Sequence, residues 1–182
     1  MAMTTSNMLA IGQPAANFSL PDTQGNNVSL SDYQGSKGLV VAFICNHCPY
    51  VKSIINQIIL DTKELAELGI NSVAIMSNDP NEYEEDSFEN MKKISSDLNF
   101  SFPYLLDETQ EVAKAFGAVC TPDFFGYDKN LGLQYRGRLN ESRKESVDGA
   151  KRELFEAMKE IAISGNGPRH QTPSIGCSIK WF

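Results

Sequence analysis

The chain has 182 residues, 41% of them apolar, which suits one domain with a sizeable core. Aspartate and glutamate outnumber lysine and arginine 23 to 16, and the net charge of -7 argues against nucleic acid or an anionic membrane as the main partner. There is no apolar run of about 18 residues and no pattern typical of a signal peptide, so we expect no membrane span and a cytoplasmic location.

The first half of the chain predicts a hairpin and two buried strands with a helix between them. Residues 17–30 alternate apolar and polar side chains around a turn rich in Gly and Asn, which is typical of a β-hairpin. The runs "LVVAFI" (39–44) and "NSVAIMS" (71–77) are apolar and rich in β-branched residues, which favours buried strands. Between them, apolar residues recur at helical spacing from Pro49 until Gly69 ends the pattern.

The second half continues the alternation of helices and strands and closes with a hairpin. In chain order, the predicted elements are a helix at 87–98, a short strand at 103–107, a helix at 108–117, strands at 123–128 and 133–139, and a helix at 145–163. Strands that alternate with helices indicate an α/β fold, and the final hairpin makes the central sheet mixed.

Residues 164–182 differ in amino-acid composition from the domain that we assign to residues 1–163. They are rich in Gly and Pro, yet they end in apolar side chains that include Ile179, Trp181 and Phe182. Since disordered tails are poor in such residues, we predict an irregular tail that docks on the domain by burying them.

Two sets of charged residues are interpreted as exposed. The segment "DPNEYEEDSFE" (79–89) carries six acids and no base, typical of a solvated loop that leads into a helix N-terminus. A docking surface for a basic partner is the alternative. Arg136 and Arg138 alternate along a predicted outer strand, and we expect both to face solvent.

The segment "CNHCPYVKS" (45–53) carries the clearest chemical signal. Cys45 and Cys48 fall where a buried strand ends and a helix begins, and the helix N-terminus stabilises a thiolate there. We expect Cys45 to lie exposed at the helix cap, to have the lower pKa and to attack disulfides, and Cys48 to resolve the mixed disulfide. His47, as an imidazolium, would favour the reduced form further.

Two other interpretations of the pair stay open. Cys45 and Cys48 can be structural thiols, or they can belong to a metal site completed by distant residues such as Cys120, Cys177 or His170. Zinc sites usually take four ligands, often from two Cys-x-x-Cys pairs, and there is no second pair. No metal and no other cofactor is therefore predicted.

Two long segments resemble a known family. "IGQPAANFSLPDTQGNNVSLSDYQGSKGLVVAFICNHC" is similar to the opening of thioredoxin-like redoxins of the AhpC/TSA and TlpA–ResA type, and "LLDETQEVAKAFGAVCTPDFFGYDKNLGLQYRGRL" is similar to their second half. The resemblance covers about residues 10–163 and implies a thioredoxin-like fold. The end "PSIGCSIKWF" resembles the tail of a bacterial subgroup of these proteins.

The resemblance also implies a function and further site residues. It implies thiol-disulfide exchange in an antioxidant role, with protein or small-molecule disulfides as substrates and a thiol reductant for recycling. Pro122 matches a cis-proline that faces the cysteine pair, which would leave the backbone of Thr121 free to pair with an extended substrate. Asn46, inside the motif, is the other residue expected to contact substrate. The oligomeric state stays open.

The chain departs from the family pattern at two points. Ile44 replaces the usual tryptophan before the first cysteine, and residues 39–44 contain no acid to match the buried acid of many thioredoxins. His47 is the candidate to replace it as the proton acceptor.

A thiol-dependent peroxidase that acts on peroxides through Cys48 is the second hypothesis. The peroxidases of the family carry Thr-x-x-Cys before a proline, and Cys48 fits that cysteine while Cys45 occupies the place of the threonine. The arginine that polarises the peroxide in those enzymes has no clean match here, and Arg138 and Arg143 are candidates for it.

A third hypothesis is a protein that binds or delivers copper or zinc through Cys45 and Cys48. Copper carriers of this fold have one more residue between their cysteines. Cys120 and Cys177 are interpreted as core fillers or as additional redox thiols.

Overall fold

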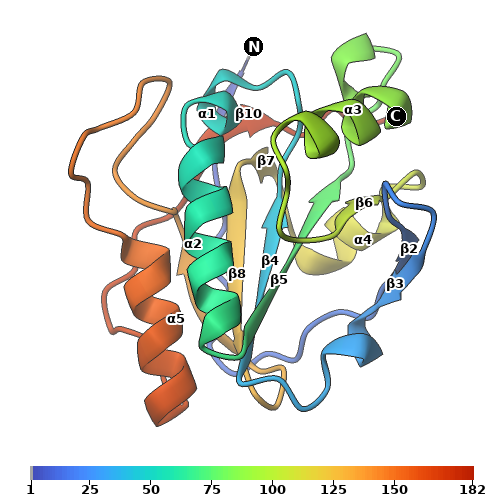
Figure 1. Ribbon diagram of the computed structural model, residues 1–182. Coiled ribbons are helices and arrows are strands. Elements are labelled where there is room, and N and C mark those ends of the chain that lie inside the picture. Colours follow the sequence, from blue (N-terminus) through green and yellow to red (C-terminus); the bar gives the residue numbers. More distant parts are fainter. Residues whose placement is uncertain (1) are drawn as a thin grey trace.

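Five strands form the central sheet of the computed structural model, which describes residues 2–182 (Figure 1). Their order is β6-β5-β4-β8-β9, where β4, β5 and β6 run parallel and β8 and β9 are antiparallel to their neighbours. The strands are β4 (Gly38–Phe43), β5 (Ile70–Met76), β6 (Tyr104–Leu106), β8 (Asp123–Asp128) and β9 (Leu133–Gly137). The predicted α/β fold with a mixed sheet is confirmed.

The central strand β4 is buried along its whole length, as its apolar sequence requires. Val41 lies opposite Val73 of β5 and Phe125 of β8, so β4 has a strand on each side and helices on both faces. Strands buried in this way read as continuous apolar runs rather than as alternating patterns.

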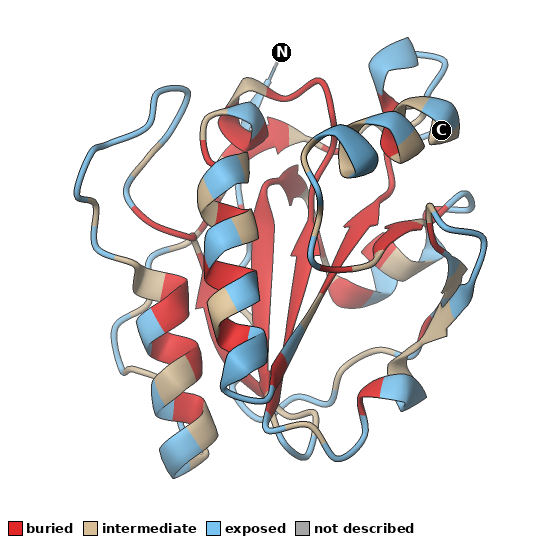
Figure 2. Ribbon diagram, viewed as in Figure 1, coloured by how far each residue is buried: buried red, intermediate tan, exposed pale blue. Residues whose placement is uncertain are grey.

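Helices cover both faces of the sheet (Figure 2). On one face, α2 and α5 pack against side chains such as Val40 and Phe124, and α3 completes the same core. On the other face, Phe116 of α4 packs edge-on against Phe43 and Phe125. The helices are α1 (Pro49–Lys52), α2 (Ile55–Glu67), α3 (Phe88–Asp97), α4 (Glu111–Phe116) and α5 (Glu153–Ser164), with 3₁₀ helices η1 (Leu30–Tyr33) and η2 (Glu84–Asp86).

Two helices differ from their predicted bounds. The helix expected from Pro49 is split into α1 and α2 at Ser53 and Ile54, and nothing in the structure explains the break. The last helix begins at Glu153 rather than at 145, because Gly149 adopts a left-handed φ of 70° that a helix cannot continue through.

The predicted N-terminal hairpin and the docked tail are both confirmed. The hairpin pairs β2 (Ser19–Pro21) with β3 (Asn27–Ser29). The tail is less irregular than expected, because it contributes a strand to a small second sheet of order β1-β10-β7. That sheet consists of β1 (Met3–Thr5), β7 (Cys120–Thr121) and β10 (Ile175–Ser178).

Backbone hydrogen bonds hold the tail, whereas its terminal aromatic side chains contribute little. The backbone N–H of Ile179 donates to Val119, and the N–H of Lys180 donates to the side chain of Asn78. Trp181 is 40% exposed and Phe182 is 70% exposed, so the expectation that these two anchor the tail by burial is wrong. Ile179, by contrast, is buried in the core, as expected. The tail is ordered by pairing with β1 and β7, although its glycines and prolines prevent a helix.

The expected exposure of Arg136 is also wrong. Its guanidinium is fully buried, forms an ion pair with Asp123 across β8 and β9, and lies 3.7 Å from the centre of the Phe125 ring. A buried guanidinium is tolerated when a carboxylate pairs with it and other acceptors satisfy its N–H groups. Arg138, two residues on, is partly buried and pairs with Glu153 of α5.

No helix within residues 2–182 is long and apolar enough to cross a membrane.

Candidate active site

The two motif cysteines lie where β4 ends and α1 begins, beside β7 and β10 (Figure 1). Cys48, not Cys45, is the N-cap of α1, because Pro49 occupies the first helical position. Cys45 lies three residues earlier, in the loop after β4. The helix dipole therefore acts on the second cysteine, and the expected place of Cys45 at the cap is corrected.

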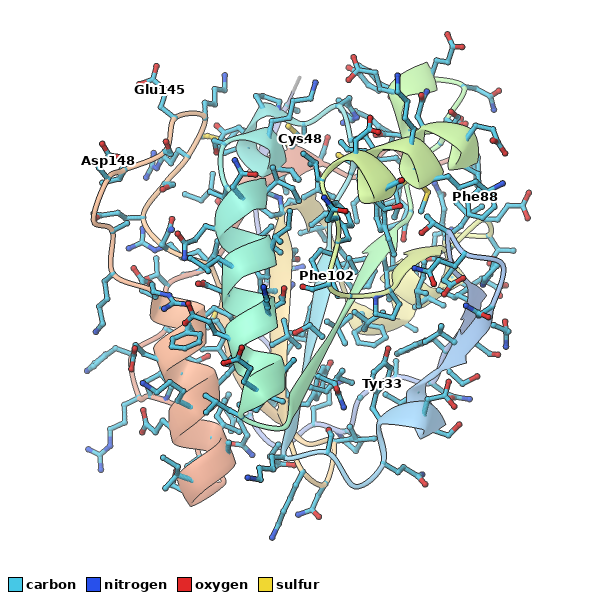
Figure 3. The ribbon with its side chains drawn as sticks, viewed as in Figure 1. Tyr33, Cys48, Phe88, Phe102, Glu145 and Asp148 are labelled. Atoms are coloured by element: carbon cyan, nitrogen blue, oxygen red, sulfur yellow. The ribbon has the colours of Figure 1, made fainter. Side chains whose placement is uncertain are left out.

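The sulfur of Cys48 is surrounded by donors. The thiols of Cys177 and Cys45 are its hydrogen-bond partners and stabilise its thiolate, and the backbone N–H group of Cys177 adds to this effect. Burial opposes ionisation, but the thiol hydrogen bonds from Cys177 and Cys45 outweigh it and lower the pKa of Cys48 well below that of a free thiol. In its protonated form, Cys48 donates to the Thr121 carbonyl at 3.3 Å. Figure 3 shows Cys48 near α1 and β10.

Cys45 has the opposite electrostatic environment. Burial, its hydrogen bond to Cys48 and the nearby Asp86 carboxylate all raise the pKa of Cys45. Its sulfur lies 3.1 Å from the hydroxyl oxygen of Thr121. Cys45 is only 1% exposed, so both the expected exposure and the expected low pKa of Cys45 are wrong.

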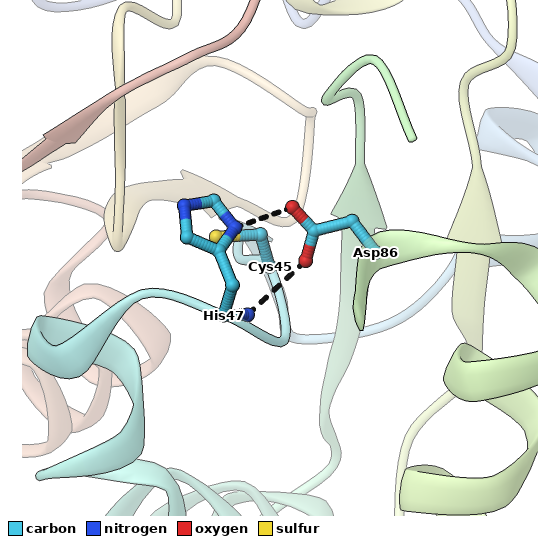
Figure 4. A group of neighbouring side chains, drawn as sticks. All are labelled: Cys45, His47 and Asp86. Atoms are coloured by element: carbon cyan, nitrogen blue, oxygen red, sulfur yellow. Dashed lines mark hydrogen bonds and ion pairs between the residues drawn. The ribbon is translucent and has the colours of Figure 1, made fainter. Parts of the chain in front are cut away.

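A buried aspartate, Asp86, organises the loop that carries the two cysteines (Figure 4). Its carboxylate accepts from the backbone N–H groups of Asn46 at 2.7 Å and His47 at 3.1 Å, and from His47 Nδ1 at 2.5 Å. Asn78 donates a fourth hydrogen bond at 2.9 Å. Burial raises the pKa of this carboxyl, but the hydrogen bonds from His47 and Asn78 outweigh it and leave the pKa lowered.

Asp86 is the functional residue that the sequence analysis missed. It belongs to the acidic segment 79–89, which was interpreted as solvated, and its acidic neighbours Glu84 and Glu85 are exposed as expected. Asp86 itself is fully buried, because η2 turns it toward the N–H groups of the loop. No spacing in the segment distinguishes this aspartate from the others.

His47 and Asn46 are both engaged inside the protein. The ring of His47 stacks on Tyr83 with centroids 3.8 Å apart, and its Nε2 is buried with no hydrogen-bond partner among residues 2–182. The side chain of Asn46 donates to the Glu85 carbonyl and accepts from the Tyr104 hydroxyl. These contacts fix the loop conformation at both residues.

Cys45, His47 and Asp86 bring together atoms of the types that bind metal ions, all within 4.8 Å of one another. The Asp86 carboxylate already accepts four hydrogen bonds, one of them from His47 Nδ1. The cluster is therefore a hydrogen-bonded network, in which a metal would have to displace bonds that hold the loop.

The bond between Thr121 and Pro122 is cis, as predicted. The backbone beside it is not free, because Thr121 pairs with Cys177 of β10. The protein's own tail thus occupies the edge at which an extended substrate was expected to add a strand. The fit is close, since a Cβ atom on Gly176 would lie 2.0 Å from the Thr121 carbonyl oxygen.

The remaining candidate residues are dispersed. Cys120 is fully buried on β7 with its sulfur 3.8 Å from the Pro122 carbonyl, and burial raises its pKa. Arg138 and Arg143 line a small cavity beside Pro122, where Glu153 binds Arg138. His170 is exposed in the tail.

The chain is similar to proteins of known sequence and structure. It is 26% identical to the peroxiredoxin Bcp of Escherichia coli over 84% of this chain and 89% of that one. It is 26% identical to the thiol-disulfide oxidoreductase ResA of Bacillus thuringiensis over 80% and 79%. A crystal structure of an uncharacterized conserved protein from Geobacillus kaustophilus is 44% identical, covers 100% and 97%, and superposes with a TM-score of 0.94.

The Bcp and ResA relatives are oxidoreductases, and the fold is thioredoxin-like, as the resemblance implied. The AhpC/TSA family model matches residues 11–138, which is more than half of the chain and includes both motif cysteines. The protein therefore belongs to the AhpC/TSA family.

Proposed function

We propose that the protein is a thiol-disulfide oxidoreductase in which Cys48 is the nucleophile and Cys45 completes the redox disulfide. The observation that carries the proposal is the place of the Cys48 sulfur, which lies at the N-cap of α1, in contact with the thiols of Cys177 and Cys45 that stabilise its thiolate. A thiolate stabilised in this way reacts with disulfides at neutral pH. The roles are the reverse of those expected from the sequence, since the donors converge on the second cysteine.

The exchange proceeds in two steps. The Cys48 thiolate attacks one sulfur of the substrate disulfide, and the other substrate sulfur leaves as a thiolate. Cys45 then loses its proton, attacks the Cys48 sulfur and releases the second substrate thiol, which leaves a disulfide between Cys45 and Cys48. A thiol reductant must reduce this disulfide to restore the enzyme.

His47 and Asp86 are proposed to assist the second step. Burial and the nearby Asp86 raise the pKa of Cys45, so its thiol gives up its proton with difficulty. A ring nitrogen of His47 lies within 4.8 Å of the Cys45 sulfur and is the proposed proton acceptor. A histidine oriented by a carboxylate is a general base in many cysteine and serine enzymes. This pair replaces the buried acid that the strand at 39–44 lacks.

Pro122, Thr121 and Asn46 are proposed to position the sulfur atoms. Thr121 contacts both cysteines through its hydroxyl and its carbonyl, and Pro122 fixes the backbone that follows. Asn46 is better suited to hold the loop than to bind substrate, because both ends of its amide are engaged within the protein.

Peroxidase activity through Cys48 is the second candidate. What favours it is that the stabilised sulfur belongs to the cysteine that precedes Pro49, the position that resembles the peroxidase motif. What weighs against it is that Glu153 binds Arg138, one of the two arginines considered for polarising a peroxide. Arg143, the other, lines the small cavity beside Pro122.

One comparison separates the two candidates. The reduction of a small disulfide and the consumption of hydrogen peroxide are measured side by side for the wild type, Cys45→Ser and Cys48→Ser. An oxidoreductase that attacks through Cys48 loses disulfide reduction in Cys48→Ser, reduces disulfides more slowly in Cys45→Ser, and consumes peroxide slowly throughout. Rapid peroxide consumption that survives in Cys45→Ser and disappears in Cys48→Ser would favour the peroxidase instead.

Protein or small-molecule disulfides are the proposed substrates, and the family likeness to Bcp and ResA supports this class. We also propose that the protein works in the reducing cytoplasm. The support is that its cysteines are few and a close pair is more typical of catalysis than of structural stapling.

A further inference from the structure

We propose that Cys177, on the tail strand β10, is a second resolving thiol that forms a disulfide with Cys48. The proposal rests on the proposed function and deepens it, since it gives Cys48 two intramolecular partners. It also assigns a chemical role to the docked tail, which otherwise only closes the site.

The strand β10 occupies the sheet edge beside Pro122, at which an extended substrate was expected to pair. Cys177 pairs with Thr121 in antiparallel register, directly before Pro122, which is where strand addition would present the sulfur of a substrate peptide. This pairing of β10 with β7 requires a glycine at position 176, because a side chain there would collide with the Thr121 carbonyl. The tail therefore carries its own thiol to the position of an incoming disulfide.

Cys177 pairs with Thr121, whose carbonyl oxygen lies 3.3 Å from the Cys48 sulfur, and the two thiols are hydrogen-bond partners. The fold therefore brings the two sulfurs close together, as a disulfide requires. The hydrogen bond to the Cys48 thiolate is the main cause that raises the pKa of Cys177, and burial adds to it. That cause disappears once Cys48 is bonded to a substrate sulfur. Burial still raises the pKa of both remaining thiols, but Lys180 and Lys144 favour the thiolate of Cys177, whereas Asp86 opposes the thiolate of Cys45.

The step balances without any group beyond the substrate. The Cys48 thiolate attacks a disulfide R–S–S–R, the S–S bond breaks, and one RS⁻ leaves. Cys177 loses its proton to water and attacks the Cys48 sulfur, and the second RS⁻ leaves and takes up a proton. Two electrons pass from the two cysteines to R–S–S–R, which becomes two thiols, while a Cys48–Cys177 disulfide forms.

Access to Cys48 requires the tail to open locally. Cys48 and Cys177 are both almost fully buried, and β10 has four residues held between a strand of three and a strand of two. Such short ladders open at a lower free energy than the core of a domain. The proposal is therefore tested with a small disulfide.

The test counts the thiols that 2-hydroxyethyl disulfide releases from the reduced Cys45→Ser protein, which lacks the other partner. We expect two 2-mercaptoethanol molecules per chain, no retained adduct, and a Cys48–Cys177 cross-link in the peptide map. Cys45→Ser/Cys177→Ser should release one and keep the adduct on Cys48. Cys45→Ser/Cys120→Ser is the matched control, since Cys120 is equally buried, and it should release two.

The outcomes separate this proposal from the function on which it rests. If Cys45→Ser releases one thiol and holds a stable adduct on Cys48, Cys177 does not resolve it, and the proposed nucleophile stands. If neither the wild type nor Cys45→Ser releases any thiol, the proposed function itself fails. Circular dichroism checks the fold of each variant, and Cys45→Ala replaces Cys45→Ser if the serine hydroxyl unfolds the buried site.

Discussion

At the level of single residues, the thiols of Cys45, Cys48 and Cys177 lie together, and the groups around each thiol determine which of the three ionises. Hydrogen bonds with Cys177 and Cys45 lower the pKa of Cys48, whereas the pKa values of Cys45 and Cys177 are raised, so Cys48 is the thiol that ionises most readily. Neither the motif spacing nor the helix dipole alone reveals this order. It depends on Cys177, which lies 129 positions along the chain from Cys48 (177 minus 48) and reaches the site through strand pairing.

The first prediction concerns the titration of the thiols. Because the pKa of Cys48 is lowered, its thiolate should persist as the pH falls below about 8.5, where a free cysteine becomes protonated. Ultraviolet thiolate absorbance should show this low-pH step in the wild type and lose it in Cys48→Ser. In Cys45→Ser the step should stay, shifted at most upward to the extent that the serine donates a weaker hydrogen bond. A low-pH step that vanishes only in Cys45→Ser would contradict the assignment.

The second prediction concerns the buried carboxylate. Asp86→Ala removes the acceptor of four hydrogen bonds and leaves two backbone N–H groups of the loop without a partner. We expect the free energy of unfolding to fall by about 2–4 kcal/mol, measured by urea denaturation. Glu85→Ala, at the exposed neighbour, should cost less than about 1 kcal/mol. Equal losses in the two variants would mean that Asp86 does not hold the loop.

At the scale of elements, the site is built from a helix start and a tail strand. Pro49 occupies the first position of α1, so Cys48 is the N-cap residue of that helix. The strand β10 pairs with β7 and covers the cysteines from the other side. The strands β4 and β5 could be predicted from the sequence, because strands that are buried on both faces are continuous apolar runs. The hairpin of β8 and β9 could also be predicted, because a turn separates its two strands.

Other elements could not be predicted because their order comes from distant partners. The strand β10 has Gly176 in its middle and acquires its ladder only from β1 and β7. Arg136 and Asp86 look like surface charges until the fold brings a buried partner to each. A pattern within one segment contains no information about such partners.

The third prediction concerns the close packing of β10 against β7. Gly176→Ala places a methyl group where the Thr121 carbonyl lies, so the strand must shift away from β7. We expect a lower melting temperature and faster alkylation of Cys48 by a bulky maleimide, followed by mass spectrometry. Ser178→Ala, in the same strand, is the control and should change neither. Unchanged protection of Cys48 in Gly176→Ala would show that β10 is not the barrier.

At the scale of the whole molecule, the tail joins the two ends of the chain across the active site. Ser6 and Ser174 exchange backbone and side-chain hydrogen bonds, and Gln110 of the α4 cap accepts from the backbone of Phe182. The tail is thus part of the folded domain rather than an appendage to it.

The fourth prediction follows from this arrangement. A chain truncated after Gly165 loses β10 and leaves β1 without a partner, so it should melt at a lower temperature than the full chain. Its Cys48 should also react with large disulfide reagents that the full chain excludes. An unchanged melting temperature, together with rapid cleavage of the tail by protease in the full chain, would contradict the role given to the tail.

The most direct test of the account is to locate the first covalent bond between enzyme and substrate. Cys45→Ser/Cys177→Ser and Cys48→Ser/Cys177→Ser are each mixed with 2-hydroxyethyl disulfide at neutral pH, and the adduct is timed and mapped by mass spectrometry. In the first variant the serine hydroxyls take the place of the two thiol donors to Cys48, so rapid adduct formation on Cys48 is expected. In the second variant burial and Asp86 still raise the pKa of Cys45, so the rate on Cys45 should be more than about tenfold lower. Faster modification of Cys45 than of Cys48 would show that Cys45 is the nucleophile and would contradict the roles proposed for the two cysteines.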